Sequence, residues 1–320
     1  MKLIFSLLAA CLVIAGTPAQ AAAPFPTRPV RVVVPTGAGA ITDILARILS
    51  EKLSPALGQQ IVIDNRTGAG GIIGTEIVAK APPDGHTLLF AFPSHALNPS
   101  FYPSLPYDTI NDFAPITIVS YVTSVLFVNS SFPAKSVSEF IAVAKSKPGY
   151  INYGSVQASL GQLSAELFAS LAGIKIVGIS YKGGPQRDMA VISGEVHMGF
   201  TPPISLVPLI KTGKVRALGV TSKERVSAMP DVPSIAEAGL PGYESNGWNG
   251  VLAPAKTPQA IINQLHGGIV KVLQSPDVVQ QLAVQGVDPV GNTPKEFATI
   301  IKNDIEKWAK IIRGAGIKIS

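Results

Sequence analysis

Short apolar runs alternate with amphipathic stretches along most of the chain. After the first strand-like run, Ile41, Ile44, Leu45, Ile48 and Leu49 repeat at the spacing of one helix face. Strands that alternate with helices in this way predict an α/β fold with mostly parallel sheets. The runs that we expect to form strands cover residues 30–35, 61–64, 87–91, 116–120, 125–129, 151–154, 175–180, 196–200, 216–221 and 248–253.

Two predicted helices have recognisable features. The helix near Ile41 has Thr42 and Asp43 as alternative N-cap residues, because either side chain can accept a backbone hydrogen bond. The last helix, over residues 294–312, carries an apolar stripe from Phe297 to Ile312 among charged residues. Such a stripe is typical of a helix packed on the core.

Two long extended segments, at residues 116–129 and 245–254, break the alternation. Extended segments that bracket the middle of a chain indicate strands that cross between two domains. We therefore expect one domain made of residues 24–122 and 248–320, and a second made of residues 123–247. The hinge is expected near residues 121–125 and 247–251.

The N-terminus has the features of an export signal. Lys2 precedes an almost wholly apolar stretch over residues 3–15, and small residues before Pro24 offer cleavage sites. We expect residues 1–23 to be removed and the mature protein to be soluble and periplasmic. The alternative is a lipoprotein signal with a lipidated Cys11, although the apolar run continues past this residue. Cys11 is the single cysteine, so the mature chain is expected to form no disulfide.

The net charge and the positions of the reactive side chains exclude several classes of function. The formal net charge of +6 slightly favours anionic ligands, and no run of three basic residues offers a nucleic-acid surface. The four histidines are His86, His95, His197 and His266, and none of them is spaced as a metal ligand. No G-x-S-x-G nucleophile elbow is present. We expect a binding protein without cofactor, metal or nucleic-acid partner.

Two glycine-rich turns near the start of the mature chain form the main candidate site. Each follows an apolar strand and opens a helix, so glycine permits close approach and the helix N-terminus supplies unpaired N–H groups. On neighbouring parallel strands, two such turns make a cradle for an anionic group. The candidate residues are Thr36, Gly37, Ala38, Gly39, Ala40, Thr42 and Asp43 in the first turn, and Gly68, Ala69, Gly70 and Gly71 in the second.

The first turn has two other interpretations, a dinucleotide site and a simple tight turn. Gly37 and Gly39 match the start of G-x-G-x-x-G, and Asp64 ends the next strand, where a ribose-binding acid would lie. However, Thr42 stands at the third glycine, and Asp43 puts a carboxylate where a pyrophosphate would sit. Export also separates the protein from the cytosolic nicotinamide pool.

Other loops at strand ends are expected to complete the site, because ligand crevices lie at the carboxyl ends of strands in open α/β sheets. Ser155 and Ser159 lie between a strand and a helix, where they can bind a ligand, cap the helix, or do both. The further candidates in these loops are Ser94, His95, Tyr181 and Gly183.

Several motifs together carry a family resemblance over essentially the whole mature chain. They lie at residues 65–74, 83–89, 106–108, 213–222, 230–234, 241–244 and 248–250, and include Asn-Arg-Thr-Gly-Ala-Gly-Gly and Pro-Asp-Gly-His-Thr. With these motifs the chain resembles the Bug-type solute-binding proteins of tripartite tricarboxylate transporters. The resemblance implies a two-domain periplasmic-binding-protein fold (Venus flytrap, type II-like) with a hinge of crossing strands. It also implies periplasmic capture of a small carboxylate and delivery to membrane permease subunits.

The resemblance also places the site. In that family two glycine-rich loops hold one ligand carboxylate, and the matching residues here are Gly39, Ala40 and residues 68–71, with Ser155, Ser159 and residues 181–184 opposite. The chain departs from the family pattern at Ala38 and Ala40, at Thr67, in a shortened loop near residues 156–158, and at Thr201, where an acid is usual. We expect the carboxylate grip to be kept and the far end of the pocket, including Thr201, to be altered.

Two rival functions remain beside a monomeric transport receptor. An exported α/β enzyme would need a positioned acid–base pair, and the sequence shows no candidate. A periplasmic ligand sensor that signals to a kinase would have the same fold and the same site.

Overall fold

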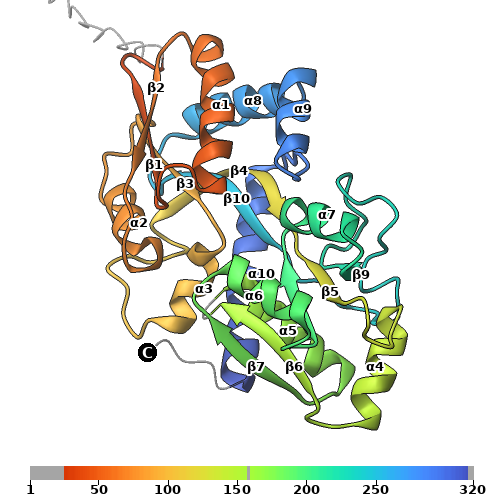
Figure 1. The fold of residues 1–320 in the computed structure, drawn as a ribbon. Coiled ribbons are helices and arrows are strands. Elements are labelled where there is room, and N and C mark those ends of the chain that lie inside the picture. The colour runs from red at the N-terminus through yellow and green to blue at the C-terminus, as the bar shows by residue number, and fades with distance from the viewer. Residues whose placement is uncertain (1–24, 157–158, 316–320) are drawn as a thin grey trace, which may run out of the picture.

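The computed structural model describes residues 25–156 and 159–315 (Figure 1). These residues form two five-stranded sheets, with strand orders β2-β1-β3-β10-β4 and β7-β6-β8-β5-β9. Each predicted strand is present, with its ends shifted by a few residues at most. The strands are β1 (Val30–Val34), β2 (Ile61–Asn65), β3 (Thr87–Ala91), β4 (Phe113–Val122), β5 (Val125–Asn129), β6 (Ile151–Val156), β7 (Ile176–Tyr181), β8 (Met198–Thr201), β9 (Val215–Val220) and β10 (Gly247–Pro254).

Helices follow most of the strands, as the alternation predicts. We call the sheet that contains β1, with α1–α3 and α8–α10, lobe 1, and the sheet that contains β6, with α4–α7, lobe 2. The helices are α1 (Ile41–Leu57), α2 (Ile72–Ala79) preceded by the short η1 (Ala69–Gly71), α3 (Ser94–Phe101), α4 (Val137–Ser146), α5 (Leu160–Ala172), α6 (Gly184–Ser193), α7 (Pro203–Lys211), α8 (Gln259–Leu273), α9 (Pro276–Val284) and α10 (Pro294–Ala315).

Most strands in each sheet run in one direction. β1 pairs in parallel with β2 and β3, whereas β10 is antiparallel to β3 and β4. In lobe 2, β6 pairs in parallel with β7 and β8, whereas β5 is antiparallel to β8 and β9. The carboxyl ends of the parallel strands therefore gather at one edge of each sheet.

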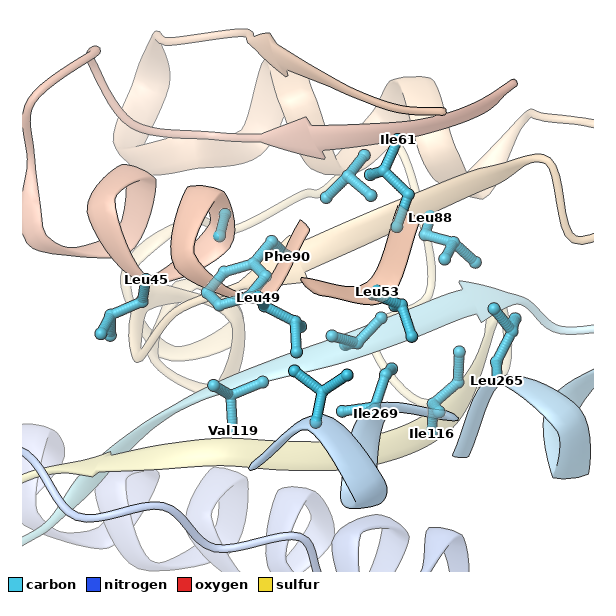
Figure 2. Packing of buried hydrophobic residues seen from close by; sticks show 14 of the residues in the cluster. Leu45, Leu49, Leu53, Ile61, Leu88, Phe90, Ile116, Val119, Leu265 and Ile269 are labelled. Atoms are coloured by element: carbon cyan, nitrogen blue, oxygen red, sulfur yellow. The ribbon is translucent and has the colours of Figure 1, made fainter. Parts of the chain in front are cut away.

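Helices cover both faces of the lobe 1 sheet, which explains why β1 is apolar except at Arg31. Successive side chains of a strand point to opposite faces. Val30, Val32 and Val34 pack in the cluster that includes side chains of α1 and α8 (Figure 2), whereas Val33 packs in a second cluster with side chains of α10. The nearly continuous apolar run of β1 therefore corresponds to a strand buried on both sides.

The chain crosses between the lobes at the two extended segments that interrupt the helical rhythm. One crossing joins β4 to β5, and the other leads from β9 to β10. The crossings are hydrogen-bonded to each other, since the N–H of Ser124 donates to Thr221 Oγ1 (2.8 Å) and the N–H of Thr221 donates to the Ser124 carbonyl (2.8 Å). The two lobes thus share one compact connection.

The last helix packs on the core, as its apolar stripe predicts, but it contacts both lobes. Its first half joins the lobe 1 cluster through Phe297 and Ile301. Its second half places Trp308 and Ile312 in a separate cluster with Leu163 of α5. The position of α10 therefore ties lobe 1 to one face of lobe 2.

A pocket of about 480 Å³ lies on the outer side of the crossing strands. Residues 286–290 form one wall, and they are anchored beyond β4 by the pairing of Ser120 with Pro289. Asp288 reaches from this wall to lobe 2, where it accepts hydrogen bonds from the hydroxyl and the N–H of Ser227. None of the candidate site residues lines this pocket, so it is separate from the glycine-rich turns.

Candidate functional site

The first glycine-rich turn connects β1 to α1. Ala40 is the N-cap of α1 and makes no side-chain capping bond, so the prediction that Thr42 or Asp43 caps the helix is wrong. Both residues lie within the first helical turn instead. There the Thr42 hydroxyl donates to Asn249 Oδ1 of β10 (3.2 Å), and Asp43 reaches back to the preceding loop.

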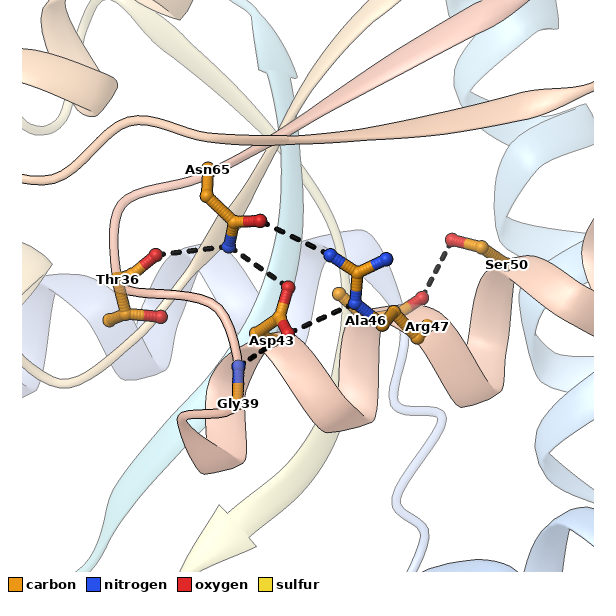
Figure 3. A network of polar contacts seen from close by, with 7 residues as sticks. All are labelled: Thr36, Gly39, Asp43, Ala46, Arg47, Ser50 and Asn65. Carbon is orange, nitrogen blue, oxygen red and sulfur yellow. Dashed lines mark hydrogen bonds and ion pairs between the residues drawn. The ribbon is translucent and has the colours of Figure 1, made fainter.

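Asp43 is itself buried and holds the first turn in place through a network of polar contacts (Figure 3). Its carboxylate accepts hydrogen bonds from the Gly39 N–H (2.9 Å), Asn65 Nδ2 (2.9 Å) and Arg47 Nε (3.0 Å). Asn65, at the end of β2, also donates to the Thr36 carbonyl (3.0 Å). Burial raises the pKa of Asp43, but these hydrogen bonds outweigh it and leave the pKa below its usual value. Asp43, predicted as a ligand contact, therefore acts as an ionised brace between the turn, α1 and β2.

The second turn lies beside the first, because β2 pairs with β1. Gly68, Ala69, Gly70 and Gly71 all have positive φ, at 126°, 46°, 63° and 91°. A Cβ on Gly71 would lie 2.6 Å from Phe92 Cε1 and 3.2 Å from Pro35 Cβ. Glycine at this position is thus required both by the backbone and by close packing against the first turn.

The loop after β3 lies at the same edge of the sheet, but the side chain of its histidine does not point toward the glycine-rich turns. Ser94 begins α3 and is half-buried, whereas His95 is 2% exposed. Rings of Tyr107, Phe113 and Trp248 surround His95, and burial lowers its pKa to about 4. The prediction that His95 lines the cleft is wrong. α3 starts at Ser94, one residue before His95, and its first turn directs the imidazole into the core.

In lobe 2, the strand that carries Ser155 leads to the helix that Ser159 caps. Ser155 is buried at the end of β6. Ser159 Oγ accepts from the Gln162 N–H (3.2 Å) and donates to the Val156 carbonyl (2.7 Å), so its predicted capping role is confirmed. The ligand-binding role of both serines stays a prediction. The shortened loop falls partly on residues 157–158, outside the described residues.

The next loop of lobe 2 follows β7, which is paired with β6. The Tyr181 hydroxyl donates to Glu195 Oε1 (2.8 Å), and burial together with this carboxylate raises the pKa of Tyr181 to about 12. Gly183 is the N-cap of α6, with an extended backbone that any residue can adopt. Tyr181 therefore remains protonated at neutral pH, with its proton directed to Glu195.

Thr201, at the end of β8, belongs to a charged cluster that no sequence motif indicated. Its hydroxyl accepts from Arg187 Nη2 (2.8 Å) and donates to Asp188 Oδ2 (3.1 Å). Arg187 and Asp188 follow each other in α6 and are each 7% exposed. An Arg-Asp pair shortly after a strand-end loop was the only sequence signal, and many solvent-exposed helices share it.

The two lobes meet next to these loops. A Cβ on Gly247, the first residue of β10, would lie 2.4 Å from Pro93 Cγ of lobe 1 and 3.1 Å from Leu160 Cδ2 of lobe 2. Only glycine fits between the loop after β3 and the start of α5. The helix end that Ser159 caps therefore lies near the loops of lobe 1, as a site between the lobes requires.

Other kinds of site receive no support from the described residues. Within residues 25–156 and 159–315, no three His, Cys, Asp or Glu side chains are grouped so that they can hold a metal ion. In the same part of the chain, no helix is long and apolar enough to cross a membrane. Asp64, which would bind the ribose in a dinucleotide site, instead forms ion pairs with Arg31 and Arg66.

Comparisons with known proteins identify the family and the fold of the chain. The profile described as tripartite tricarboxylate transporter family receptor matches residues 45–317. Protein BugT of Bordetella pertussis is 36% identical over 298 residues, which cover 92% of this chain and 91% of BugT. The solved structures of R. palustris Rpa4515 with adipate and of MatC (Rpa3494) from Rhodopseudomonas palustris with bound malate are 36% and 32% identical, with TM-scores of 0.75 and 0.70. They cover 92% and 90% of this chain, which in turn covers 99% and 100% of theirs.

These matches confirm the two-lobed binding-protein fold and the resemblance found in the motifs. They also support a receptor rather than an exported enzyme, since the matched proteins are receptors that bind solutes. The chain belongs to the tripartite tricarboxylate transporter receptor family.

Proposed function

We propose that the protein is a periplasmic receptor that captures a small carboxylate between its lobes and delivers it to a membrane permease. The observation that carries the proposal is the pair of glycine-rich turns on adjacent strands β1 and β2, each opening a helix. The relatives solved with adipate and with malate support a carboxylate as the ligand. Residues 1–23, the expected export signal, lie outside the described residues.

The structure narrows the donors available to this carboxylate. The Gly39 N–H donates to Asp43, and the Ala40 N–H donates to the Gly37 carbonyl (3.1 Å). Helix geometry leaves N–H groups unpaired in the first turn of α1 and at the start of η1. η1 leads directly into α2, where the Ile72 N–H already donates to the Ala69 carbonyl. The partial positive charge of the unpaired groups favours a carboxylate over a neutral group. We therefore assign the cradle to these helix starts, with the glycine turns shaping the approach.

The test is binding of small carboxylates to the mature protein, beside the neutral amide of each acid. A ligand at about 100 times its dissociation constant should stabilise the fold by roughly 2.7 kcal/mol. Thermal unfolding detects this shift, and calorimetry gives the affinity. If the amides stabilise the protein as strongly as the acids, the carboxylate proposal is wrong. Uptake by cells that carry or lack the receptor then tests delivery to a permease.

Closure of the lobes on the ligand is expected to separate the contact between Ser227 and Asp288. The glycine turns lie on one side of the crossing strands, and residues 286–290 lie beyond β4 on the other side. Rotation about the crossing strands that closes one side opens the other. We expect the mature protein to be monomeric. Closure of its lobes should make its radius of gyration, measured by small-angle scattering, smaller with ligand than without it.

An Asp288→Ala variant should bind the ligand roughly twofold to fivefold more tightly, because an exposed hydrogen bond that favours the open form is lost. The matched control is Asp277→Ala, which removes an exposed carboxylate whose partner, Lys52, belongs to the same lobe. Weaker binding by Asp288→Ala, or an equal gain in the control, would show that the contact does not oppose closure.

A further inference from the structure

The pocket beyond the crossing strands, which we call the outer pocket, is enclosed by both lobes. It is lined by residues 286–290 of lobe 1, by residues 222–226 of lobe 2, and by residues 121, 123, 244 and 246 of the crossing segments. The lobe 1 wall touches lobe 2 at two points. The Ser227 hydroxyl donates to Asp288, and a Cβ on Gly286 would lie 3.4 Å from Ile204 Cβ of α7. The volume of about 480 Å³ therefore suits a small ligand that contacts both lobes at once.

The charged side chains make the outer pocket acidic. Three carboxylates line it, those of Glu224, Glu244 and Asp288. Arg225 and Lys223 line it too, but the guanidinium is already paired with Glu237 (3.3 Å). Among the described residues, the carboxylates of Glu224 and Glu244 accept no hydrogen bond and form no ion pair. In a chain with a net charge of +6, this local excess of negative charge favours a cationic ligand.

The outer pocket also offers hydrogen-bond donors. Asn246 is only 9% exposed, and its Oδ1 accepts from the hydroxyls of Thr123 and Thr221 (3.5 Å each). Its Nδ2 has no acceptor in the part of the chain that the structure describes, and a buried amide without an acceptor is costly. Burial and the nearby Glu244 carboxylate raise the pKa of Tyr121, so its hydroxyl stays protonated as a second donor. A ligand that carries an acceptor beside its positive charge would satisfy these groups.

The remaining walls suit an extended organic molecule. The apolar residues that line the outer pocket are Val226, Val287, Pro289 and Val290. The three carboxylates come from separate segments and, like the other described residues, form no group that can hold a metal ion. Two ammonium groups joined by a methylene chain can meet such separated carboxylates, while the chain packs on the apolar walls.

We propose that the outer pocket binds a small amino compound with two ammonium groups and one carboxylate, the chemistry of a basic amino acid, and that its occupation weakens carboxylate capture between the lobes. The ammonium groups bind Glu224 and Glu244 on one side and Asp288 on the other, and the carboxylate accepts from Asn246. Closure on the glycine-rich turns separates the walls of the outer pocket, so a ligand that holds both walls favours the open form. The binding site is independent of the proposed function, and only its effect on carboxylate affinity depends on that function.

The first experiment measures direct binding to the mature protein by calorimetry. The probe is L-lysine, beside 1,5-diaminopentane, which lacks the carboxylate, and norleucine, which lacks the second ammonium group. We expect L-lysine to bind about tenfold or more tightly than either analogue, because each analogue loses one charge-assisted contact. Absence of L-lysine binding would overturn the proposal.

A double variant locates the bound L-lysine. Glu224→Gln with Glu244→Gln removes two exposed and unpaired carboxylates, so the protein should fold normally and bind L-lysine about tenfold or more weakly. The matched control is Asp231→Asn with Glu306→Gln. These two carboxylates are also exposed, make no hydrogen bond or ion pair with the described residues, and lie outside the outer pocket. Equal affinities in the natural protein and the pocket variant would show that L-lysine binds elsewhere.

The second experiment measures coupling between the two sites. Adipate and malate are titrated with increasing fixed concentrations of L-lysine. The apparent dissociation constant of the carboxylate should rise to a plateau about fivefold higher, since coupling between two distinct sites is limited and reciprocal. The rise should be absent in the Glu224→Gln, Glu244→Gln variant, whose carboxylate affinity without L-lysine should equal that of the natural protein.

The outcomes separate this inference from the proposed function. A dissociation constant that rises without limit would mean that L-lysine competes for the cradle, and one that does not change would mean that the outer pocket is not coupled to it. Either result contradicts the inference and leaves the receptor function standing. If no carboxylate binds, but L-lysine binding depends on Glu224 and Glu244, the outer pocket is supported as a site and the proposed function fails.

Discussion

A Gly37→Asp variant is expected to fold like the natural protein and to lose its carboxylate ligand almost completely. The backbone of Gly37 lies outside the left-handed region, and a Cβ there meets no atom within 4 Å. The aspartate thus adds a negative charge beside the start of α1 without strain. Repulsion at the cradle and loss of close approach should weaken binding by about a hundredfold or more.

The matched control is Gly37→Asn, which has nearly the same size and no charge. Calorimetry should show a much smaller loss of affinity for this variant, and thermal unfolding of both variants without ligand should match the natural protein. Equal losses for Asp and Asn would show that shape, not charge, matters at the turn. Full affinity in a folded Gly37→Asp protein would overturn the anion cradle.

Gly37 is a better position for this test than Gly39 or Gly70. These two have φ of 82° and 63°, so any side chain there strains the backbone. A folding defect in a Gly39→Asp or Gly70→Asp variant would then mimic a binding defect. The distinction depends on backbone angles, which glycine positions in the sequence do not reveal.

An Asp43→Ala variant is expected to lose about 3 kcal/mol of folding stability and most of its ligand affinity. The substitution leaves the Gly39 N–H and one Asn65 amide hydrogen without their acceptor, and it removes the carboxylate that pairs with Arg47. Because the network joins the first turn to β2, both halves of the cradle should become disordered together. Chemical denaturation measures the first effect, and calorimetry with ligand measures the second.

The Asp43 network should also contribute to acid sensitivity. Since folding holds the pKa of Asp43 below its usual value of 3.8, its contribution is complete above that value and is lost as the pH falls through the lower folded pKa. Denaturation of the natural protein and of Asp43→Asn should therefore differ most at neutral pH and converge in acid. A constant difference at all pH values would mean that the ionised carboxylate does not supply the stabilisation.

Much of the architecture follows from local patterns in the sequence. Apolar runs between turn residues mark the strands, and the interruption of the helical alternation at β4, β5 and β10 marks the crossings between the lobes. The two glycine turns were identifiable because strand, glycine and helix start are adjacent in the chain. The capping role of Ser159 was predictable for the same reason, since a cap and its helix are local. The domain boundaries at residues 122 and 248 stay a prediction.

The functional details that depend on distant contacts became visible only in the tertiary structure. His95 and Ser94 are neighbours in sequence, yet one is enclosed by Tyr107, Phe113 and Trp248 and the other is half-buried at the helix start. Asp43 acts as a brace because β2 brings Asn65 beside it.

Two other features also depend on contacts between residues that are far apart in the sequence. The α10 stripe predicted a packed helix but not that Trp308 reaches lobe 2. Arg187 belongs to a buried charged cluster because β8 places Thr201 against α6. Sequence by itself determined the elements and the glycine turns, because helix, strand and turn preferences are local. The partners of each charged side chain were decided by the tertiary structure, because strand pairing and helix packing join residues that are far apart in the chain.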